Sequence, residues 1–513
     1  MITKYWLYLW AEKKYIMRKI TAFIFLCFLT MKSFQLSGQQ KVTMTMEDVI
    51  SMAQEYSLDA MLAKNTYLAD YWSYRSHQAE LLPSLNFSAD IGNFDRSQRA
   101  LQDTETGEIR YLLNNNMINA GTLSIDQNIP LTGGTLSFSS NLERLDQYSP
   151  ARNTSYYTRP VTLQYLQPLW GYNRLKWDKK IEPERYKQAK IAYIELMEDI
   201  TIKAVQYYFN LLLAQKNYEI AVSNYEKMKT MYDIASRRLR ETGSLTLSEL
   251  LQLELRMVND SLSISTNNRQ LQAWKMNLCS FLGYNDNTDI ELIPMTEVPE
   301  VVLDYNLIME KAMENSSFLI GQKINKLEAE RIVEQAKANR GISVALGARF
   351  GMSNNDERFK SAYSDLMNYQ VLGLSVRIPL VDWGMGKGRV QMADARRKTT
   401  LFRQEQALND YVRSIYLDVQ DFNTLREQFR IANYANEIAI KRYELTLQDF
   451  AAGKVSVTEL NTAQSEKESA QMKYILEMSN YWINYFRIRK LSLYDYINNT
   501  DIYAEFDKLI NSN

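Results

Sequence analysis

The chain has 513 residues, and its sixty basic and sixty acidic side chains leave no net charge. This balance does not favour a polyanion, so we expect no nucleic-acid partner. The chain has two cysteines and a single histidine. Because metal clusters and most catalytic triads need more of these residues, we predict no metal site, no cofactor and no enzymatic activity.

The first 38 residues have the pattern of an export signal. A basic stretch with Lys13, Lys14, Arg18 and Lys19 precedes a short apolar run, ITAFIFLCFL, and small and polar residues follow it. The run is shorter than the ~20 apolar residues of a spanning helix, so we predict a signal peptide over 1–38, with Met17 as an alternative start. No later run is long enough for such a helix. The exported chain is therefore expected either to be dissolved outside the inner membrane or to span an outer membrane by strands.

The remainder of the chain repeats one plan twice. The segment RETGSLTLSELLQLE at 240–254 aligns without gaps with FAAGKVSVTELNTAQ at 450–464, and three further pairs of segments match in the same order. Each half reads as a helix, strands, a long helix, a turn and a returning helix. We therefore predict a first repeat over 39–298, a second repeat over 299–498 and a C-terminal tail over 499–513.

Alternating apolar and polar residues predict strands in both repeats. The first repeat has the longer strand region, and its excess contains a hairpin that turns at Gly133–Gly134. Long polar connections follow the strands at the other end, including 96–117, as in outer-membrane barrels. The predicted strands are 85–95, 118–130, 134–146 and 160–169 in the first repeat and 342–352 and 369–380 in the second.

The segment IPLVDWGMGKG at 378–388 has three glycines between a strand and a helix, which is the context of a phosphate-binding loop. Its spacing differs from G-x-G-x-x-G, and the matching segment of the first repeat, QPLWGYN, has only one glycine. Both segments share a proline, an aromatic residue and a glycine before a helix. We therefore interpret them as barrel-to-helix junctions and not as a nucleotide site. The junction residues are Pro168, Gly171, Pro379 and Gly384.

The long helices carry an unbroken apolar seam. From Ala204 to Leu239, small, apolar and tyrosine residues recur at three- and four-residue spacing, which predicts a coiled-coil helix over Glu184–Arg240. Its counterpart would cover about Arg389–Phe450. Each helix would be roughly 85 Å long at 1.5 Å per residue, which is too long for a compact globule. Tyrosine suits a seam with a wet edge, because its ring packs while its hydroxyl stays solvated.

The two helical hairpins have similar tips. A glycine supplies the positive φ angle that ends one helix, and a hydroxyl residue N-caps the next helix. A glutamate three residues after the hydroxyl would favour the helix dipole. These residues are Gly243, Thr246 and Glu249 at the first tip and Gly453, Ser456 and Glu459 at the second.

The strands of one chain are too few to close a wide barrel, and lipid does not tolerate open sheet edges. We therefore expect several identical chains to close one shared barrel. The features that indicate a family are the duplicated plan, the helix end AELLP at 79–83, the strand-ending segments QPLWG and IPLVDWG, and the paired tips. On these features, the sequence resembles the TolC family of outer-membrane channels over about 43–498. The resemblance implies a homotrimer with a β-barrel in the outer membrane, continued by a long α-helical barrel through the periplasm.

One feature departs from the family pattern. Family members contribute two strands from each half, or twelve per trimer. Four strands in the first half of this chain would give eighteen, unless the extra hairpin at 118–146 projects as a flap. The sequence leaves both arrangements open.

The resemblance also implies a passive exit duct of a tripartite efflux or type I secretion system. Its partners would be a periplasmic adaptor and an inner-membrane transporter of the RND or ABC type. In the family, acidic side chains six and nine residues after the second tip glycine line the periplasmic mouth, and these positions are Glu459 and Thr462 here. Glu459 keeps the carboxylate, although its twin Glu249 favours a simple helix-terminal role. The adaptor would dock at the tips, around Gly243, Thr246, Glu249, Gly453 and Ser456.

Two other classes stay open. A periplasmic adaptor is also an exported helical-hairpin protein, but it normally has one hairpin flanked by the halves of a small β-rich domain. A purely structural coiled coil would not need the strand pairs or the glycine-proline corners. The substrate, whether drug, metal or protein, is not determined by the sequence.

Overall fold

The computed structural model describes residues 41–511, except 103–106, 108, 150, 242–245, 285–287 and 296–297. The described chain forms two compact bodies. The hairpin body comprises residues 41–58, 204–298 and 435–476, and the sheet body comprises 59–203, 299–434 and 477–511.

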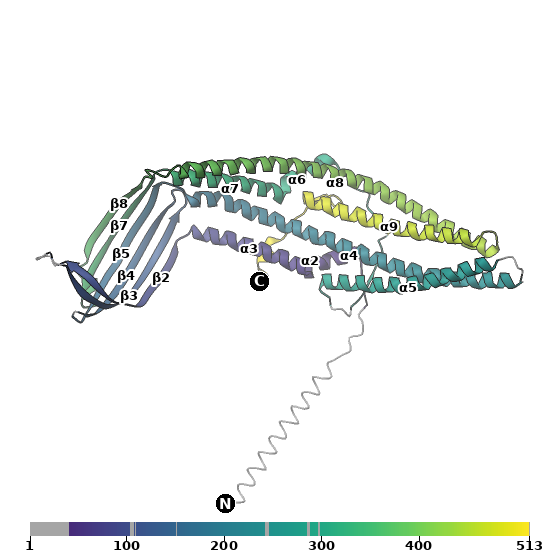
Figure 1. Ribbon diagram of the computed structural model, residues 1–513, viewed down its shortest axis with the longest axis horizontal. Coiled ribbons are helices and arrows are strands. Elements are labelled where there is room, and N and C mark those ends of the chain that lie inside the picture. Colours follow the sequence, from purple (N-terminus) through teal and green to yellow (C-terminus); the bar gives the residue numbers. More distant parts are fainter. Residues whose placement is uncertain are drawn as a thin grey trace, which may run out of the picture. The chain divides into compact units, whose positions relative to one another are not determined.

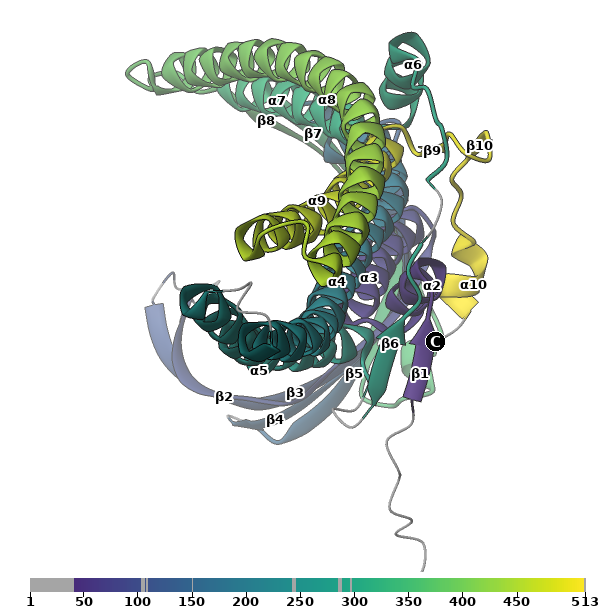
Figure 2. The same cartoon turned by 90° about the vertical axis from the view of Figure 1, so that its right-hand side faces the viewer.

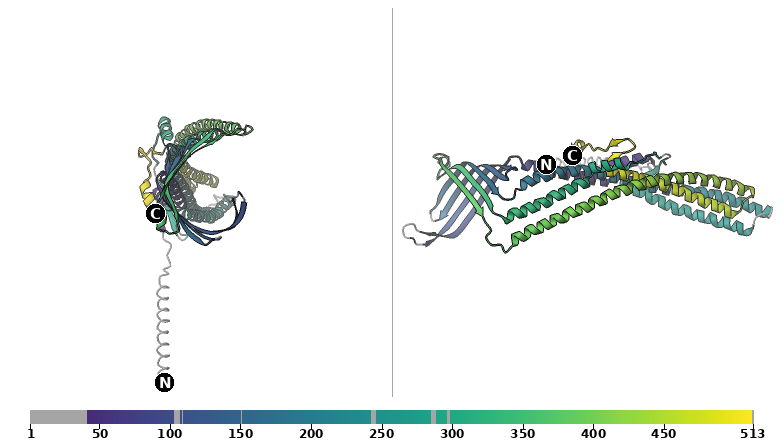
Figure 3. Two further views of the ribbon diagram at one scale, coloured as in Figure 1. Left: turned by 90° about the vertical axis from the view of Figure 1, so that its left-hand side faces the viewer. Right: turned by 90° about the horizontal axis from the view of Figure 1, so that it is seen from above.

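The sheet body contains one antiparallel sheet of six strands (Figure 1). The strand order is β2-β3-β4-β5-β7-β8, so each strand pairs with the next strand of the sheet along the chain. The sheet is strongly curved (Figure 3). The strands are β2 (Ser84–Gln102), β3 (Ile109–Ile129), β4 (Gly134–Ser149), β5 (Asn153–Trp170), β7 (Ser343–Asp356) and β8 (Met367–Arg377).

The hairpin of β3 and β4 lies inside this sheet, between β2 and β5. The strands also reach beyond the predicted bounds, since most of the segment 96–117 is paired strand. The alternation of apolar and polar residues stops in this segment, but backbone pairing continues. Amide side chains add to the pairing: Asn114 Nδ2 donates to Asp95 Oδ2 at 2.7 Å, and Asn116 Nδ2 donates to Asn114 Oδ1 at 3.0 Å. Periodicity was therefore a poor guide to where these strands end.

The register gives the sheet one apolar and one polar face. Ile125 lies between Leu85 and Phe138 on the neighbouring strands, and the row continues through Leu163 to Phe350. Because side chains alternate across a strand, the residues between these positions occupy the opposite face. That face carries hydroxyl and amide groups near this row, from Asn86, Ser124, Ser137, Thr162 and Gln164.

Most helices of the described chain are long, and α4, α8 and α9 each contribute several turns to both bodies. None of the helices in the described ranges is long and apolar enough to cross a membrane. The helices are α2 (Met46–Tyr56), α3 (Leu58–Glu80), α4 (Arg174–Glu241), α5 (Leu247–Leu282), α6 (Tyr305–Asn315), α7 (Ser317–Arg340), α8 (Met385–Ala452), α9 (Val457–Ser492) and α10 (Phe506–Asn511), with a 3-10 turn at Ser361–Tyr363.

In the sheet body, α4 begins ten residues before the predicted start at Glu184 and contains Pro183. Proline removes one helical hydrogen bond, but packing keeps the preceding turns helical. Trp177 and Ile181 of these turns pack against Ile320 and other residues of α7. The C-terminal end of α9 is tied to α4 by Arg489, whose guanidinium donates to both carboxylate oxygens of Glu198 at 2.7 Å.

In the hairpin body, the seam of α4 has the expected pattern. Its small and aliphatic positions, such as Ala204, Leu211 and Ala235, are buried, whereas the seam tyrosines, such as Tyr218, are only partly buried. Two short parallel strands lie side by side next to α2 (Figure 2): β1 (Lys41–Met44) and β6 (Asp289–Leu292). The four hairpin helices share one buried cluster of Met228, Met231, Ala235, Leu253, Tyr443, Phe450, Val457, Leu460 and Ala463.

Candidate functional site at the hairpin tips

The second tip has the geometry of a glycine C-cap. Gly453 has a φ of 80°, its N–H donates to Phe450 O at 2.9 Å, and the N–H of Lys454 donates to Asp449 O at 2.9 Å. Only glycine adopts this left-handed conformation without strain. Ser456 then begins α9, because its Oγ accepts the N–H of Glu459 at 3.2 Å.

Arg238 of the first hairpin reaches the end of α8 in the second. Its Nη1 donates to Phe450 O at 3.1 Å, and its Nη2 donates to Ala451 O. A cation at this place suits the negative end of the helix dipole. A Cβ on Gly453 would lie 3.2 Å from Arg238 Nη1, so the glycine also leaves room for the guanidinium. The sequence alone does not indicate this role of Arg238, because its partners are more than 200 residues away.

The first tip is described only from Thr246 onward, and Gly243 lies outside the described residues. Thr246 and Glu249 form a capping box: Thr246 Oγ1 accepts the N–H of Glu249 at 3.2 Å, and Glu249 Oε2 accepts the N–H of Thr246 at 2.9 Å. The second bond and the Thr246 hydroxyl lower the pKa of Glu249. Its contribution to stability is therefore present above its unfolded pKa and lost as the pH falls through the lowered value.

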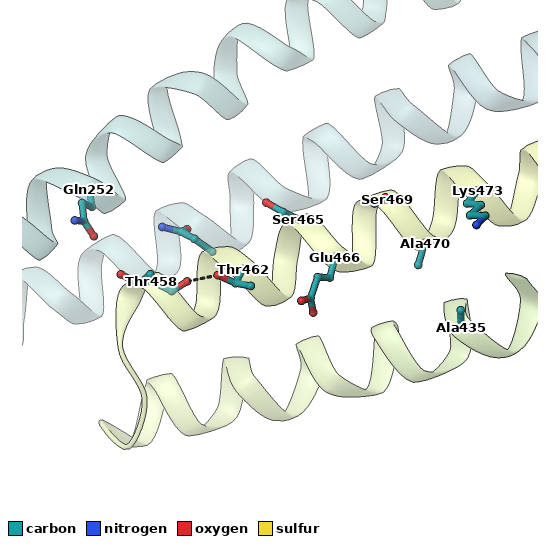
Figure 4. Close-up of a pocket in the computed structure, with 10 residues that line it drawn as sticks. Gln252, Ala435, Thr458, Thr462, Ser465, Glu466, Ser469, Ala470 and Lys473 are labelled. Atoms are coloured by element: carbon teal, nitrogen blue, oxygen red, sulfur yellow. Dashed lines mark hydrogen bonds between the residues drawn. The ribbon is translucent and has the colours of Figure 1, made fainter.

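The two residues assigned to the gate are both exposed on α9. Thr462 Oγ1 donates to Thr458 O at 2.9 Å, and both threonines line an open groove of about 790 Å³ (Figure 4). Glu459 does not line this groove, although its N–H completes the cap on Ser456. The groove is lined by Gln252, Ala435, Thr458, Asn461, Thr462, Ser465, Glu466, Ser469, Ala470 and Lys473.

Polar residues interrupt the buried seam of α9 between Leu460 and Met478. Gln464 and Lys467 continue its three- and four-residue spacing, yet both are buried. Lys467 Nζ lies 4.3 Å from the centre of the Tyr443 ring, and burial lowers the pKa of this lysine. These two positions are not among the predicted site residues, although the heptad spacing of α9 indicates that both face the seam.

Glu468 is the centre of a network that joins α4, α5 and α9. Its Oε1 accepts from Asn224 Nδ2 at 2.6 Å, from Gln464 Nε2 at 2.9 Å and from Arg256 Nη2 at 3.0 Å. Arg256 Nε also lies 3.2 Å from Asp260 Oδ1, and burial raises the pKa of Asp260. In the described part of the chain, no three His, Cys, Asp or Glu side chains are grouped as metal ligands.

The glycine-rich junction before α8 binds a carboxylate of its own chain. Asp382 accepts the N–H of Gly384 at 2.9 Å and the N–H of Gly386 at 2.7 Å. Gly384 has a φ of 86°, and a Cβ on Gly386 would lie 2.7 Å from Asp382 Oδ2. These N–H groups resemble those that hold a phosphate at a helix N-terminus, but here Asp382 takes that place. Pro379 lies just before this turn, after the end of β8.

The corresponding junction of the first repeat is capped differently. Asn173 Oδ1 accepts the N–H of Lys176 at 3.1 Å, and its Nδ2 donates to Pro130 O in the β3–β4 turn at 3.0 Å. Gly171 is unhindered, since a Cβ there would meet nothing within 4 Å. Pro168 lies in β5 beyond the last residue paired with β4. Because no hydrogen bond to β4 is needed there, the lack of an N–H on proline does not weaken that pairing.

Comparison with known proteins gives one family and several similar folds. Residues 309–492 match the model of the outer membrane efflux protein family. The match covers about a third of the chain. This match and the solved structures confirm the expected resemblance to TolC-family channels. Both agree with the expectation that the chain is not an enzyme. No curated protein sequence matches the chain significantly.

The solved structures agree over most of the chain. The CmeC outer membrane channel of Campylobacter jejuni has 16% identity and a TM-score of 0.64, covering 91% of this chain and 88% of CmeC. The outer membrane protein VceC of Vibrio cholerae has 14% identity and a TM-score of 0.59, covering 87% and 95%. CusC has 15% identity and a TM-score of 0.60, covering 90% and 95%. At such identities the likeness shows the fold, and it confirms the expected TolC-like class, in which long coiled-coil helices are combined with a β-sheet region.

Proposed function

We propose that this protein is the outer-membrane exit duct of a tripartite efflux or type I secretion system. It would conduct substrates passively from an inner-membrane transporter of the RND or ABC type and a periplasmic adaptor to the exterior. The observation that carries the proposal is a six-stranded sheet with one apolar and one polar face. A sheet with these faces suits lipid on one side and a water-filled lumen on the other.

The edges of the sheet body favour a ring of identical chains. At one edge, α3 exposes a strip at three- and four-residue spacing that includes Leu62, Ala69 and Trp72, with Trp72 59% exposed. On α8, Phe402 and Leu417 are also exposed. Seams of this kind are stable when another helix covers them. We propose that α3 of one copy packs against α8 of the next, which closes the homotrimer implied by the family resemblance.

The hairpin tips are the proposed docking site for the adaptor. The link from Arg238 to α8 supports this assignment, because it holds the two tips of the hairpin body together. Glu459 is the proposed gate residue. Three copies of its exposed carboxylate around a narrow mouth would favour cations. Thr462 lacks the charge for a second acidic ring.

Fractionation and bilayer recording test the proposed function. The mature protein should be found in the outer membrane, run as a trimer in mild detergent and form channels in planar bilayers. A processed chain that is monomeric and dissolved without detergent would reject the proposal. It would favour instead a periplasmic adaptor or a structural coiled coil.

A further inference from the structure

The two edge strands of the sheet run in opposite directions. The sheet has six strands, and every neighbouring pair is antiparallel, so β2 and β8 are antiparallel to each other. If β8 of one copy lies beside β2 of the next, the new pair is antiparallel as well. Identical copies can therefore extend this sheet into a ring without changing its pairing pattern.

The apolar face of the sheet includes apolar residues of both edge strands. On β2, Leu85 and Phe87 are 68% and 72% exposed, and on β8, Leu372 and Leu374 are 73% and 59% exposed. Each edge strand is paired on one side only within the described chain, so its other side has no neighbouring strand. Unpaired backbone groups are unfavourable in lipid, so a membrane-embedded sheet of this kind needs a strand at each edge.

We propose that three copies join β8 to β2 of the next copy and close an eighteen-stranded barrel. This inference rests on the proposed function and goes further, because the family pattern is twelve strands. For strands about 4.8 Å apart and tilted by about 40°, eighteen strands give a diameter of roughly 36 Å between backbones, against roughly 24 Å for twelve. Side chains reaching about 5 Å inward leave bores on the order of 26 Å and 14 Å.

The β3–β4 hairpin contributes to the barrel wall and also extends past the lipid. Its apolar face ends near the pair of Gly121 and Leu142, and the next pair on that face is Asn119 and Arg144. Strands that cross a bilayer need about 9–11 residues, whereas β3 has 21. The far half of the hairpin therefore forms a polar rim outside the membrane. The inner face, with hydroxyl and amide groups, suits hydrated solutes too wide for a twelve-stranded barrel.

Cysteine cross-linking tests the joint between copies. In a Cys279→Ser background, Phe87→Cys is combined in turn with cysteine on the apolar-face positions of β8. At least one pair should yield a covalent trimer on oxidation, reversed by reductant. Phe87→Cys with Leu163→Cys on the inner strand β5 is the matched control and should stay monomeric on a denaturing gel. The β8 substitutions are Asn368→Cys, Gln370→Cys, Leu372→Cys, Leu374→Cys and Val376→Cys.

Polymer labelling tests the width of the bore. Ser139→Cys and Thr122→Cys place thiols on the polar face, and maleimide-linked poly(ethylene glycol) of increasing size is added outside intact cells. Polymers about 20 Å wide should label both sites, because the expected bore is on the order of 26 Å. Phe138→Cys, on the lipid-facing side, should stay unlabelled.

Two results would reject the eighteen-stranded barrel but leave the proposed channel function intact. One is an outer-membrane trimer in which no β2–β8 pair cross-links between copies, or in which the pairs link only within one chain. The other is a labelling limit below about 14 Å, the bore expected for twelve strands. Absence of any trimer in the outer membrane would reject the proposed function as well.

Discussion

At the second tip, neighbouring residues have separate physical tasks. Gly453 provides the left-handed turn and leaves room for Arg238, and Ser456 caps α9. Glu459 completes the cap through its backbone N–H, so its exposed carboxylate is available for another role. At the first tip the matching carboxylate of Glu249 is occupied by the N–H and hydroxyl of Thr246. This difference between the twins favours a gate role for Glu459 over a purely helix-terminal one.

Glu459→Ala should loosen the closed mouth. We expect higher channel conductance and a weaker preference for cations, because a ring of carboxylates is removed. Glu249→Ala is the matched control. It should cost about 1 kcal/mol of stability through the lost cap but leave conductance unchanged. Planar-bilayer recording measures both variants, and an unaltered conductance and cation preference in Glu459→Ala would reject the gate assignment.

Gly453→Ala should strain the second tip. Alanine at a φ of 80° costs roughly 1–2 kcal/mol, and its Cβ would press on Arg238. Gly283→Ala is matched in strain, with a φ of 76°, but its Cβ would meet only Tyr56 O at 3.4 Å.

Thermal unfolding and co-purification of the adaptor separate these two effects. Both glycine variants should lower the unfolding temperature by similar amounts. Only Gly453→Ala should reduce co-purification, because Gly453 belongs to the proposed docking tip and Gly283 does not. Equal co-purification by both variants would argue against docking at the second tip.

At the scale of elements, the coiled coils combine an apolar seam with a buried polar stretch. Gln464 and Lys467 replace aliphatic residues in the seam of α9. A polar seam residue usually lowers stability but restricts which helices pair and in which register. Here Lys467 and Glu468 of α9 both bond to the side chain of Asn224 on α4, and Gln464 donates to Glu468 within α9. A shift of α9 along α4 would break the two bonds to Asn224.

Two neighbouring glutamates of α9 allow a matched comparison. Glu468→Ala should lower the free energy of unfolding by about 1–3 kcal/mol, because it leaves Arg256 and Asn224 without their shared acceptor. Glu466→Ala removes an ion pair with Arg442 in which both side chains are nearly half exposed, and it should cost less than about 1 kcal/mol. Urea unfolding followed by circular dichroism measures the difference. Equal costs would show that the Glu468 network adds no specific stability.

At the scale of the whole molecule, one chain leaves apolar surface without a partner. The exposed strip of α3 and the apolar face of the sheet are features that a separate, dissolved chain rarely keeps. Assembly of identical chains would cover the strip, and lipid would cover the sheet face. The proposed trimer thus accounts for both surfaces.

Trp72→Glu should prevent assembly. The substitution places a charge on the strip of α3 that is proposed to pack against α8 of the next copy, and burying an unpaired charge is strongly unfavourable. Ser73→Glu, exposed on the next position of the same helix, should leave the trimer intact. Size-exclusion chromatography with light scattering in mild detergent measures both masses. A trimer of Trp72→Glu as stable as that of Ser73→Glu would place the interface elsewhere.

The sequence by itself determined the features that depend on local pattern. The repeat, the wet tyrosine seam and the glycine-to-serine turn at 453–456 follow from residue spacing, since periodicity and caps act within a few turns. Glu459 and Thr462 were identified from the family resemblance, and their gate role remains a prediction.

Only the tertiary structure decided which distant segments meet. It placed the β3–β4 hairpin inside the sheet, brought Arg238 to the end of α8 and joined Arg256 to Glu468. Each of the two arginine contacts links residues more than 200 positions apart, and no local spacing encodes such a pairing. Strand pairing and polar networks depend on the packing of whole elements, which is why they became visible only in the folded chain.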